Sequence, residues 1–224
     1  MNSFSLEGFD FAGFDHLIIT PGKIPPGIPG RIRRNPKRNI SPLRVNQVHG
    51  GIVHRITKDS VADFETPPPG DGIITDLPEI PLAVATADCV PLFAIEESGE
   101  FCGVIHCGWR SVAAGIVENA MAVLRNSGAE IGNLHFAMGP AILGDEYEVG
   151  PEVAQIFPDS TRKLTGGKYL LDLPSEIERR LRKSGAGGEI IPPPLSTYSS
   201  EWLPSYRREG EKAGRMLSVV RRIR

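Results

Sequence analysis

Short apolar runs recur along the chain and are separated by Pro, Gly and Asn, a pattern that predicts many short strands. The run HLIIT, for example, stops at Pro21-Gly22, and LRVNQVHGGIVHRIT divides into two strand-like halves around Gly50-Gly51, which puts His49 at a turn. We therefore predict strands at 16–20, in the two halves of 43–57, in two runs within 81–97, and at 101–106, 135–142 and 214–223.

Helical spacing of apolar residues is found in fewer places. The stretch SVAAGIVENAMAVLRNSG predicts a helix over 112–124 with Ser111 as its N-cap. Pro151 and Pro174 each stand where the first turn of a helix accepts proline, and Gly185 ends the second of these helices, within 170–185. Because strands outnumber helices and several are joined by short turns, we predict an α+β fold of mixed β-sheet layers with flanking helices.

The length and composition fit one globular unit. The chain has 224 residues, of which 40% are hydrophobic and 23% charged, which is enough to bury a substantial core. We expect a single domain over 1–224, with a Pro/Gly-rich N-terminal loop at about 21–40. Five basic residues lie between Arg31 and Arg38 in this loop, and such runs are usually solvated.

Charge and cysteine content narrow the class of protein. The formal net charge is -2, so no basic surface indicates a nucleic-acid partner. No apolar stretch reaches the length of a membrane span, and no basic residue precedes an apolar run at the N-terminus, so we expect a cytoplasmic protein. The three cysteines lie within 19 positions without the spacing of a disulfide framework, which predicts reduced thiols.

Three residues that bear chemistry share one property, since His49, Cys89 and His106 each lie where an apolar run meets a turn. Two His and one Cys would suit a catalytic zinc site with an open fourth position. A Cys–His nucleophile pair without metal is an alternative, and spacing alone favours ordinary core or surface roles for a single His or Cys. Cys107 follows His106 directly, and strand alternation directs it to the opposite face, while Cys102 is expected in the core.

Several short motifs occur in one order along the chain. They are Gln47-Val48-His49-Gly50, Asp71-Gly72-Ile73-Ile74-Thr75, Thr86-Ala87-Asp88-Cys89-Val90-Pro91, His106-Cys107-Gly108-Trp109-Arg110, Gly139-Pro140-Ala141-Ile142 and Tyr147-Glu148-Val149-Gly150, followed by Ser205-Tyr206-Arg207-Arg208 and Gly214-Arg215. From about residue 45 to the end, the chain thus resembles the laccase-domain family, also called the polyphenol oxidase or YfiH-like family.

The resemblance implies a fold, a cofactor and a choice of activities. It implies a CNF/YfiH-like cysteine hydrolase-type fold and one Zn²⁺ bound by His49, Cys89 and His106. Family members are described as purine nucleoside phosphorylases that cleave adenosine, inosine or methylthioadenosine with phosphate, often with adenosine deaminase activity. Others are described as peptidoglycan editing factors that act on a muramyl precursor. The expected partner is therefore a small molecule, and the oligomeric state is left open.

Further residues are candidates for substrate contact. Arg110 and, as the weaker candidate, Arg207 are placed to bind phosphate, and a surface ion pair is the alternative role for each. Asp88 is a candidate to orient a ligand or act as a base, with a turn cap as the alternative, and Gln47 is a candidate to contact substrate.

The sequence also departs from the family pattern, and alternative functions remain open. A Thr-Arg-x-Gly-Gly turn found in members is absent after Thr20, and Arg31, Arg33 or Arg34 would have to replace its Arg. Five His are too few for a multicopper oxidase centre, so we do not expect copper oxidation. A metal-free Cys–His hydrolase and a non-enzymatic binding protein remain as alternatives.

Overall fold

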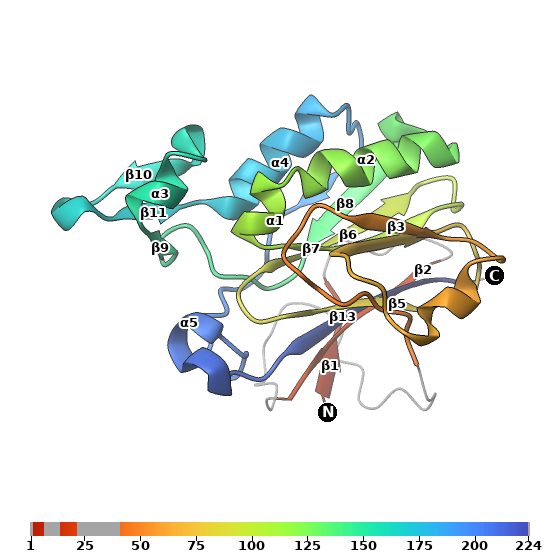
Figure 1. The fold of residues 1–224 in the computed structure, drawn as a ribbon, viewed down its shortest axis with the longest axis horizontal. Helices are drawn as coiled ribbons and strands as arrows, with labels where there is room; N and C mark the ends of the chain where they lie inside the picture. Colours follow the sequence, from red (N-terminus) through yellow and green to blue (C-terminus); the bar gives the residue numbers. More distant parts are fainter. Residues whose placement is uncertain (1, 7–13, 22–40, 224) are drawn as a thin grey trace.

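The computed structural model describes residues 2–6, 14–21 and 41–223, and shows two packed β-sheets with a layer of helices on the larger one (Figure 1). The α+β class predicted from the pattern of strands and helices is confirmed. Most of the predicted N-terminal loop, including Arg31, Arg33 and Arg34, lies outside the described residues.

The larger sheet has six strands and is mixed, as expected. Its central strands β6 and β7 are buried along their whole length, because helices cover one face and the second sheet covers the other. Strand β3 is parallel to β4 and β12 is parallel to β8, and the other neighbours are antiparallel. In sheet order the strands are β12 (Ile190–Ile191), β8 (Leu134–Met138), β6 (Val90–Glu96), β7 (Cys102–Cys107), β4 (Gly72–Thr75) and β3 (Val53–Ile56).

The smaller sheet has four antiparallel strands and packs face to face on the larger one. Buried apolar side chains of both sheets, such as Val84 and Met216 from one and Phe93 and Val104 from the other, form a single cluster between them. In sheet order these strands are β1 (Asn2–Phe4), β2 (Phe14–Thr20), β13 (Met216–Arg222) and β5 (Leu82–Thr86).

Helices α2 and α4 lie side by side over the outer face of the six-stranded sheet (Figure 1). Their apolar faces, which include Met121, Leu124, Ile177 and Leu181, share a cluster with sheet residues such as Phe136. The α-helices are α1 (Trp109–Ala113), α2 (Ile116–Ser127), α3 (Pro151–Ala154), α4 (Leu173–Lys183) and α5 (Tyr206–Glu209). No helix within the described ranges is long and apolar enough to cross a membrane.

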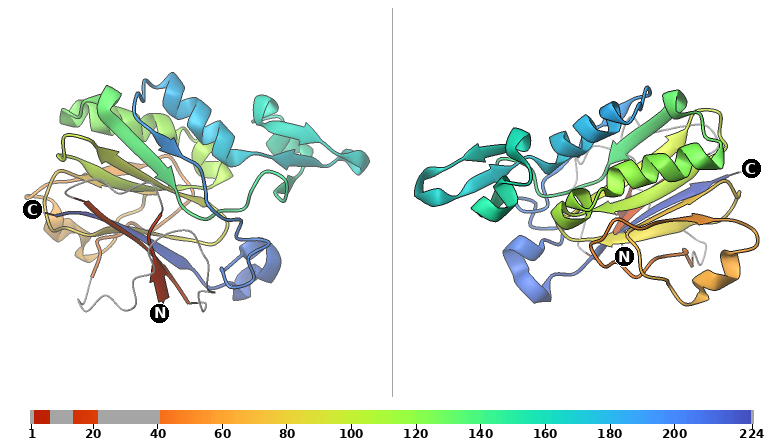
Figure 2. Two further views of the ribbon diagram at one scale, coloured as in Figure 1. Left: turned by 180° about the vertical axis from the view of Figure 1, so that it is seen from behind. Right: turned by 45° about the horizontal axis from the view of Figure 1, so that its top comes forward.

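A third sheet of three short strands projects from the body beside α3, as both views in Figure 2 show. This sheet was not predicted from the sequence, because its strands are short and their burial pattern is mixed. The strands are β9 (Glu148–Val149), β10 (Thr161–Lys163) and β11 (Tyr169–Leu171). Short 3₁₀ turns complete the described chain at Val61–Glu65, Ile131–Asn133, Pro158–Ser160, Thr165–Gly167 and Gly210–Lys212.

The helix predicted over 112–124 with Ser111 as its N-cap is wrong at its start. Two helices occupy this stretch. Gly115 adopts a left-handed conformation with φ of 80°, and this interrupts the helix between α1 and α2. Gly108 is the N-cap of α1, and Ser111 is buried inside that helix. Helix α4 is shorter than the 170–185 stretch, with Asp172 as its N-cap, and Gly185 follows its end at φ of 98° as predicted.

The predicted strand at 43–48 is also wrong. Only isolated bridges form there, from Leu43 to Leu82 and from Asn46 to Pro69. Residues 67–69, which face Asn46, are all proline and have no amide hydrogens to continue a ladder. The other predicted strands are confirmed as β2, β3, β5, β6, β7, β8 and β13.

Candidate metal centre and cavity

His49, Cys89 and His106 meet at one edge of the six-stranded sheet. In the antiparallel pair β6–β7, Val90 lies opposite Cys107, so Cys89 just before β6 comes beside His106 near the end of β7. His49 arrives from the turn before β3, where it holds a φ of 58°. The potential ligand atoms of these three residues, here called the donor cluster, lie within 4.8 Å of one another. It is the only such group of three or more among the residues that the structure describes.

Asp71 orients two members of the donor cluster and was not singled out from the sequence. One of its carboxylate oxygens lies 2.8 Å from Nδ1 of His106, and the same oxygen accepts a hydrogen bond from the backbone amide of His49 at 3.0 Å. The other oxygen accepts from the amide of Gly50 at 2.7 Å. Asp71 is fully buried, so this carboxylate fixes both the turn that carries His49 and the ring of His106.

The donor set fits a zinc ion by its chemistry and its surroundings. Because Asp71 occupies Nδ1 of His106, Nε2 is left to face Cys89 and His49, which is the arrangement found around zinc-binding histidines. The backbone of Gly108 passes directly over the cluster. A Cβ at this position would lie 2.9 Å from Sγ of Cys89 and 3.3 Å from the ring of His49, so only glycine leaves the donors accessible.

The acid–base properties of the cluster reflect its hydrogen bonds. Burial alone would raise the pKa of the Cys89 thiol, but hydrogen bonds from His106 and His49 outweigh burial and lower this pKa to about 7. Burial would lower the pKa of His106, but its bonds to Asp71 and Cys89 raise this pKa to about 9. Without metal, the arrangement therefore favours a thiolate beside an imidazolium; the same thiolate character suits a soft metal ion.

The other two cysteines point away from the donor cluster. Cys107 is fully buried in the apolar cluster beneath α2, and burial raises the pKa of its thiol. Cys102 is fully buried in the core between the sheets, where burial raises the pKa of its thiol to about 12. Neither thiol has the environment of a reactive cysteine.

The donor cluster opens into a cavity of about 750 Å³ that is also lined by three arginines. Arg110, Arg207 and Arg215, here called the cavity arginines, have no ion pair with a carboxylate of the described chain; Arg110 lies 4.3 Å above the Trp109 ring, and Arg207 lies 5.3 Å from the ring of Tyr147. Three exposed guanidiniums without counter-ions give this cavity a positive lining that suits an anion.

Asp88 joins the donor cluster to the segment that carries Arg207. One of its carboxylate oxygens accepts from Oγ1 of Thr197 and the other from the backbone amide of Arg207, both at 2.6 Å. Asp88 is 9% exposed, with a φ of 87°. Because both oxygens already accept hydrogen bonds, this geometry suits a positioning role; the predicted role as a base stays a prediction.

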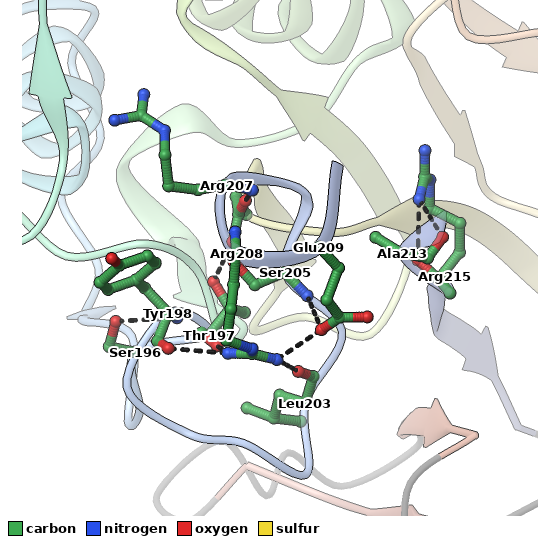
Figure 3. A network of polar contacts seen from close by, with 12 residues as sticks. Ser196, Thr197, Tyr198, Leu203, Ser205, Arg207, Arg208, Glu209, Ala213 and Arg215 are labelled. Atoms are coloured by element: carbon green, nitrogen blue, oxygen red, sulfur yellow. Dashed lines mark hydrogen bonds and ion pairs between the residues drawn. The ribbon is translucent and has the colours of Figure 1, made fainter. Parts of the chain in front are cut away.

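The segment 196–209 is held by a second arginine that does not face the cavity. Figure 3 shows the Arg208 side chain directed into this loop and the Arg207 side chain directed away from it. The guanidinium of Arg208 donates to the carbonyls of Thr197, Tyr198 and Leu203 at 2.5 to 2.7 Å. The two adjacent arginines therefore have different roles, since Arg208 stabilises the loop and Arg207 lines the cavity.

Gln47 lies at the cavity wall, and its amide group is already used. Nε2 donates to the carbonyl of Ala85, and Oε1 accepts from the amide of the same residue, both at 2.8 Å. Gln47 thus ties the turn that carries His49 to the end of β5. Its predicted contact with substrate stays a prediction.

Comparison with known proteins gives one family. The family described as multi-copper polyphenol oxidoreductase laccase matches residues 31–223. A protein of Deinococcus radiodurans named purine nucleoside phosphorylase is 32% identical over 186 residues, which are 79% of this chain and 68% of that protein. A protein of Shigella flexneri named purine nucleoside phosphorylase YfiH is 30% identical over 206 residues, which are 86% of this chain and 81% of that protein.

Solved structures show the same fold. YfiH of Bacillus licheniformis, described as a hypothetical protein, superposes with a TM-score of 0.73 at 25% identity and covers 81% of this chain and 74% of its own. YlmD of Geobacillus stearothermophilus superposes with a TM-score of 0.77 at 24% identity over the whole of both chains.

Proposed function

Since this chain belongs to the multi-copper polyphenol oxidoreductase laccase family, and its curated relatives are named purine nucleoside phosphorylase, we propose that it is a zinc-dependent purine nucleoside phosphorylase. The observation that carries the proposal is a single cavity lined by a His₂Cys donor cluster and by three arginines that form no ion pair within the described residues. Adenosine, inosine and methylthioadenosine are the proposed nucleosides, and inorganic phosphate is the second substrate.

The residues of the chain would divide the work of this reaction. His49, Cys89 and His106 would hold the zinc, which when bound supplies a Lewis acid and an acidified water. The cavity arginines would bind the phosphate dianion and hold it against the anomeric carbon of the nucleoside, where proximity and charge neutralisation assist attack. Asp71 would keep His49 and His106 in position, and Asp88 would keep Arg207 in position.

The same cavity supports deamination of adenosine as a proposed side reaction, because hydrolytic removal of an amino group needs an activated water and no phosphate. Copper oxidation is not proposed, despite the family's description. Three of the five His are hydrogen-bonded elsewhere: Leu6 donates to His16, His54 bonds to the Pro69 carbonyl, and Glu189 donates to His135. Two imidazoles at the cavity are too few for a multicopper centre.

The test is to incubate the purified protein with each nucleoside, with and without phosphate, and to identify the products. We expect ribose 1-phosphate (5-methylthioribose 1-phosphate from methylthioadenosine) and free purine base only when phosphate is present. Inosine formed from adenosine without phosphate would support the deaminase activity. Absence of both reactions would contradict the proposal and leave editing of a muramyl precursor, or binding without catalysis, as the assignments to test.

A second candidate function is favoured by the chain of contacts from Asp71 through His106 to Cys89. Without metal, these three side chains have the same order as the carboxylate, imidazole and thiol of a cysteine hydrolase site. Metal analysis of protein purified without chelator separates the two candidates. We expect one zinc per chain and loss of phosphorolysis on chelation. Activity that survives complete removal of metal, with a covalent adduct on Cys89, would instead support the hydrolase.

A further inference from the structure

Tyr147 enters the cavity on a fixed piece of backbone. It directly precedes β9, and its carbonyl accepts a hydrogen bond from the amide of Leu171 at 3.0 Å, at the end of β11. Its half-buried ring packs against the apolar cluster between the six-stranded sheet and the helices. The ring therefore lies between the core on one side and the cavity on the other, with little freedom to move.

Tyr147 brings a phenolic hydroxyl to the wall of the cavity. Tyr147 lines the same space as Cys89, Arg110 and Arg207, and its hydroxyl is not one of the fully enclosed oxygens without a partner. No residue of the described chain forms a hydrogen bond with it. A half-buried phenol without a protein partner, facing a cavity that holds donors and cations, is placed to bond to a ligand.

The surroundings keep this phenol protonated. Burial is the largest influence on the pKa of Tyr147 and raises it above its usual value, although Arg207 and Arg110 act in the opposite direction. The guanidinium of Arg207 lies 5.3 Å from the ring, so the hydroxyl is near the cation proposed to bind phosphate. A neutral O–H in this position is a hydrogen-bond donor at working pH.

We propose that Tyr147 is a catalytic residue, whose hydroxyl donates a hydrogen bond to the purine leaving group during phosphorolysis; the inference rests on the proposed function. In that reaction a phosphate oxygen forms a bond to the anomeric carbon, and the bond from this carbon to N9 of the purine breaks. The bonding electrons move onto the purine, and the proton of HPO₄²⁻ ends on the free base, so the products are ribose 1-phosphate dianion and neutral purine. The Tyr147 hydroxyl stabilises the negative charge that develops on the purine.

The other aromatic residues of the cavity fit this role less well. The ring of Trp109 is covered by Arg110 at 4.3 Å, and Tyr206 is 51% exposed. Of the aromatic side chains at this cavity, Tyr147 alone combines a fixed, half-buried ring with a free hydroxyl beside the donor cluster, among the described residues.

The variant Tyr147→Phe removes only the hydroxyl and keeps the ring that packs on the core. Inosine and 7-methylinosine are compared as substrates, because the 7-methylated base already carries positive charge and leaves without developing negative charge. We expect kcat for inosine to fall about 100-fold, while kcat for 7-methylinosine stays within about threefold of the wild-type value. The matched control is Tyr169→Phe, a half-buried tyrosine of β11 that packs on the same apolar cluster and does not line the cavity. It should leave both values unchanged.

The outcomes separate this inference from the proposed function. Equal losses for both substrates would indicate a structural role and overturn the inference, while phosphorolysis itself would stand. Unchanged kcat for inosine would also overturn it. No ribose 1-phosphate from the wild-type protein with either substrate would overturn the proposed function, and the role of Tyr147 with it.

Discussion

The donor cluster and the cavity arginines line the same cavity but are built in different ways. The donor cluster lies at the ends of buried central strands, and one fully buried carboxylate, that of Asp71, fixes two of its three members. The cavity arginines lie on short helices and at the start of β13, and their side chains are exposed. The first group is held by side-chain contacts in the core. In the second group, Arg207 donates to the carbonyl of Glu148, and Arg215 donates to the carbonyls of Ala213 and Gly214.

This difference indicates where each group tolerates change. A buried cluster loses its geometry when any member is replaced, because its partners are left unsatisfied in a medium of low dielectric. An exposed arginine has fewer partners in the chain than a donor-cluster residue, and water can take over the contacts that its loss leaves open. Changes at the donor cluster should therefore abolish function, whereas changes at the arginines should weaken substrate binding by degrees.

Cys89→Ala should have the largest effect. It removes the only sulfur ligand of the donor cluster, so we expect zinc to be lost and phosphorolysis to fall to background. Zinc per chain is measured by mass spectrometry after purification without chelator, and product formation by chromatography. A Cys89→Ala protein that kept stoichiometric zinc and full activity would remove the metal centre from the proposed function.

Asp71→Asn should come next. The amide is close in size to the carboxylate but carries no charge, and it would have to turn a donor toward one of its present partners. We expect zinc affinity to fall about 10- to 100-fold, as measured by competition with a coloured chelator. Asp76→Asn is the control, since Asp76 forms an exposed ion pair with Arg55 away from the cavity. Equal affinities in the two variants would contradict the orienting role of Asp71.

Arg207→Met should weaken phosphate binding and leave zinc in place. Charge-assisted hydrogen bonds contribute about 1.5 to 3 kcal/mol, so KM for phosphate should rise roughly 10- to 100-fold while kcat at saturating phosphate changes less. Arg162→Met is the control, because Arg162 is exposed and pairs with Asp145 outside the cavity. A change in kcat alone would place Arg207 outside the phosphate site.

Asp88→Asn should have a smaller effect of the same kind. Asparagine tolerates the positive φ of this position, so the backbone is preserved, but the amide nitrogen accepts no hydrogen bond from Thr197 or Arg207. We expect a rise of about threefold to tenfold in KM for phosphate with zinc retained. In a double-mutant cycle with Arg207→Met the two effects should not add, because Asp88 acts through Arg207. Additive effects would show that Asp88 works independently.

The donor cluster could be predicted from the sequence, but the contacts that hold it and Asp88 in place could not. His49, Cys89 and His106 were recognisable because each stands at the junction of an apolar run and a turn, and because the surrounding motifs resemble a known family. Asp71 precedes a buried strand in the same way, but its contact with His106 depends on the pairing of β4 with β7 across 35 residues. The partners of Asp88 are 109 and 119 residues away in the sequence, and the local sequence pattern does not predict such contacts.

In the fold, too, features set by the local sequence pattern were predicted, and features set by backbone conformation or distant residues were not. Strands such as β6 could be predicted from their continuous apolar runs. Such runs occur because helices bury one face of the strand and the smaller sheet buries the other. The break between α1 and α2 was missed, since the apolar spacing continues across Gly115 and only its positive φ separates the helices. The bridges at Leu43 and Asn46 resemble a strand in sequence, but the prolines that face Asn46 have no amide hydrogens to continue a ladder.

Cys107→Ala should have the smallest effect, although Cys107 is the direct neighbour of His106. Its side chain lies on the opposite face of β7, fully buried under α2. Loss of one buried sulfur should lower the free energy of unfolding by about 1 kcal/mol, as measured by urea denaturation, while zinc content and kcat stay unchanged. Loss of zinc from a folded Cys107→Ala protein would mean that both cysteines at this strand end serve the metal. If Cys107→Ala retains zinc, then the face of the strand on which a thiol lies, rather than its proximity to His106 in the sequence, decides which thiol belongs to the donor cluster.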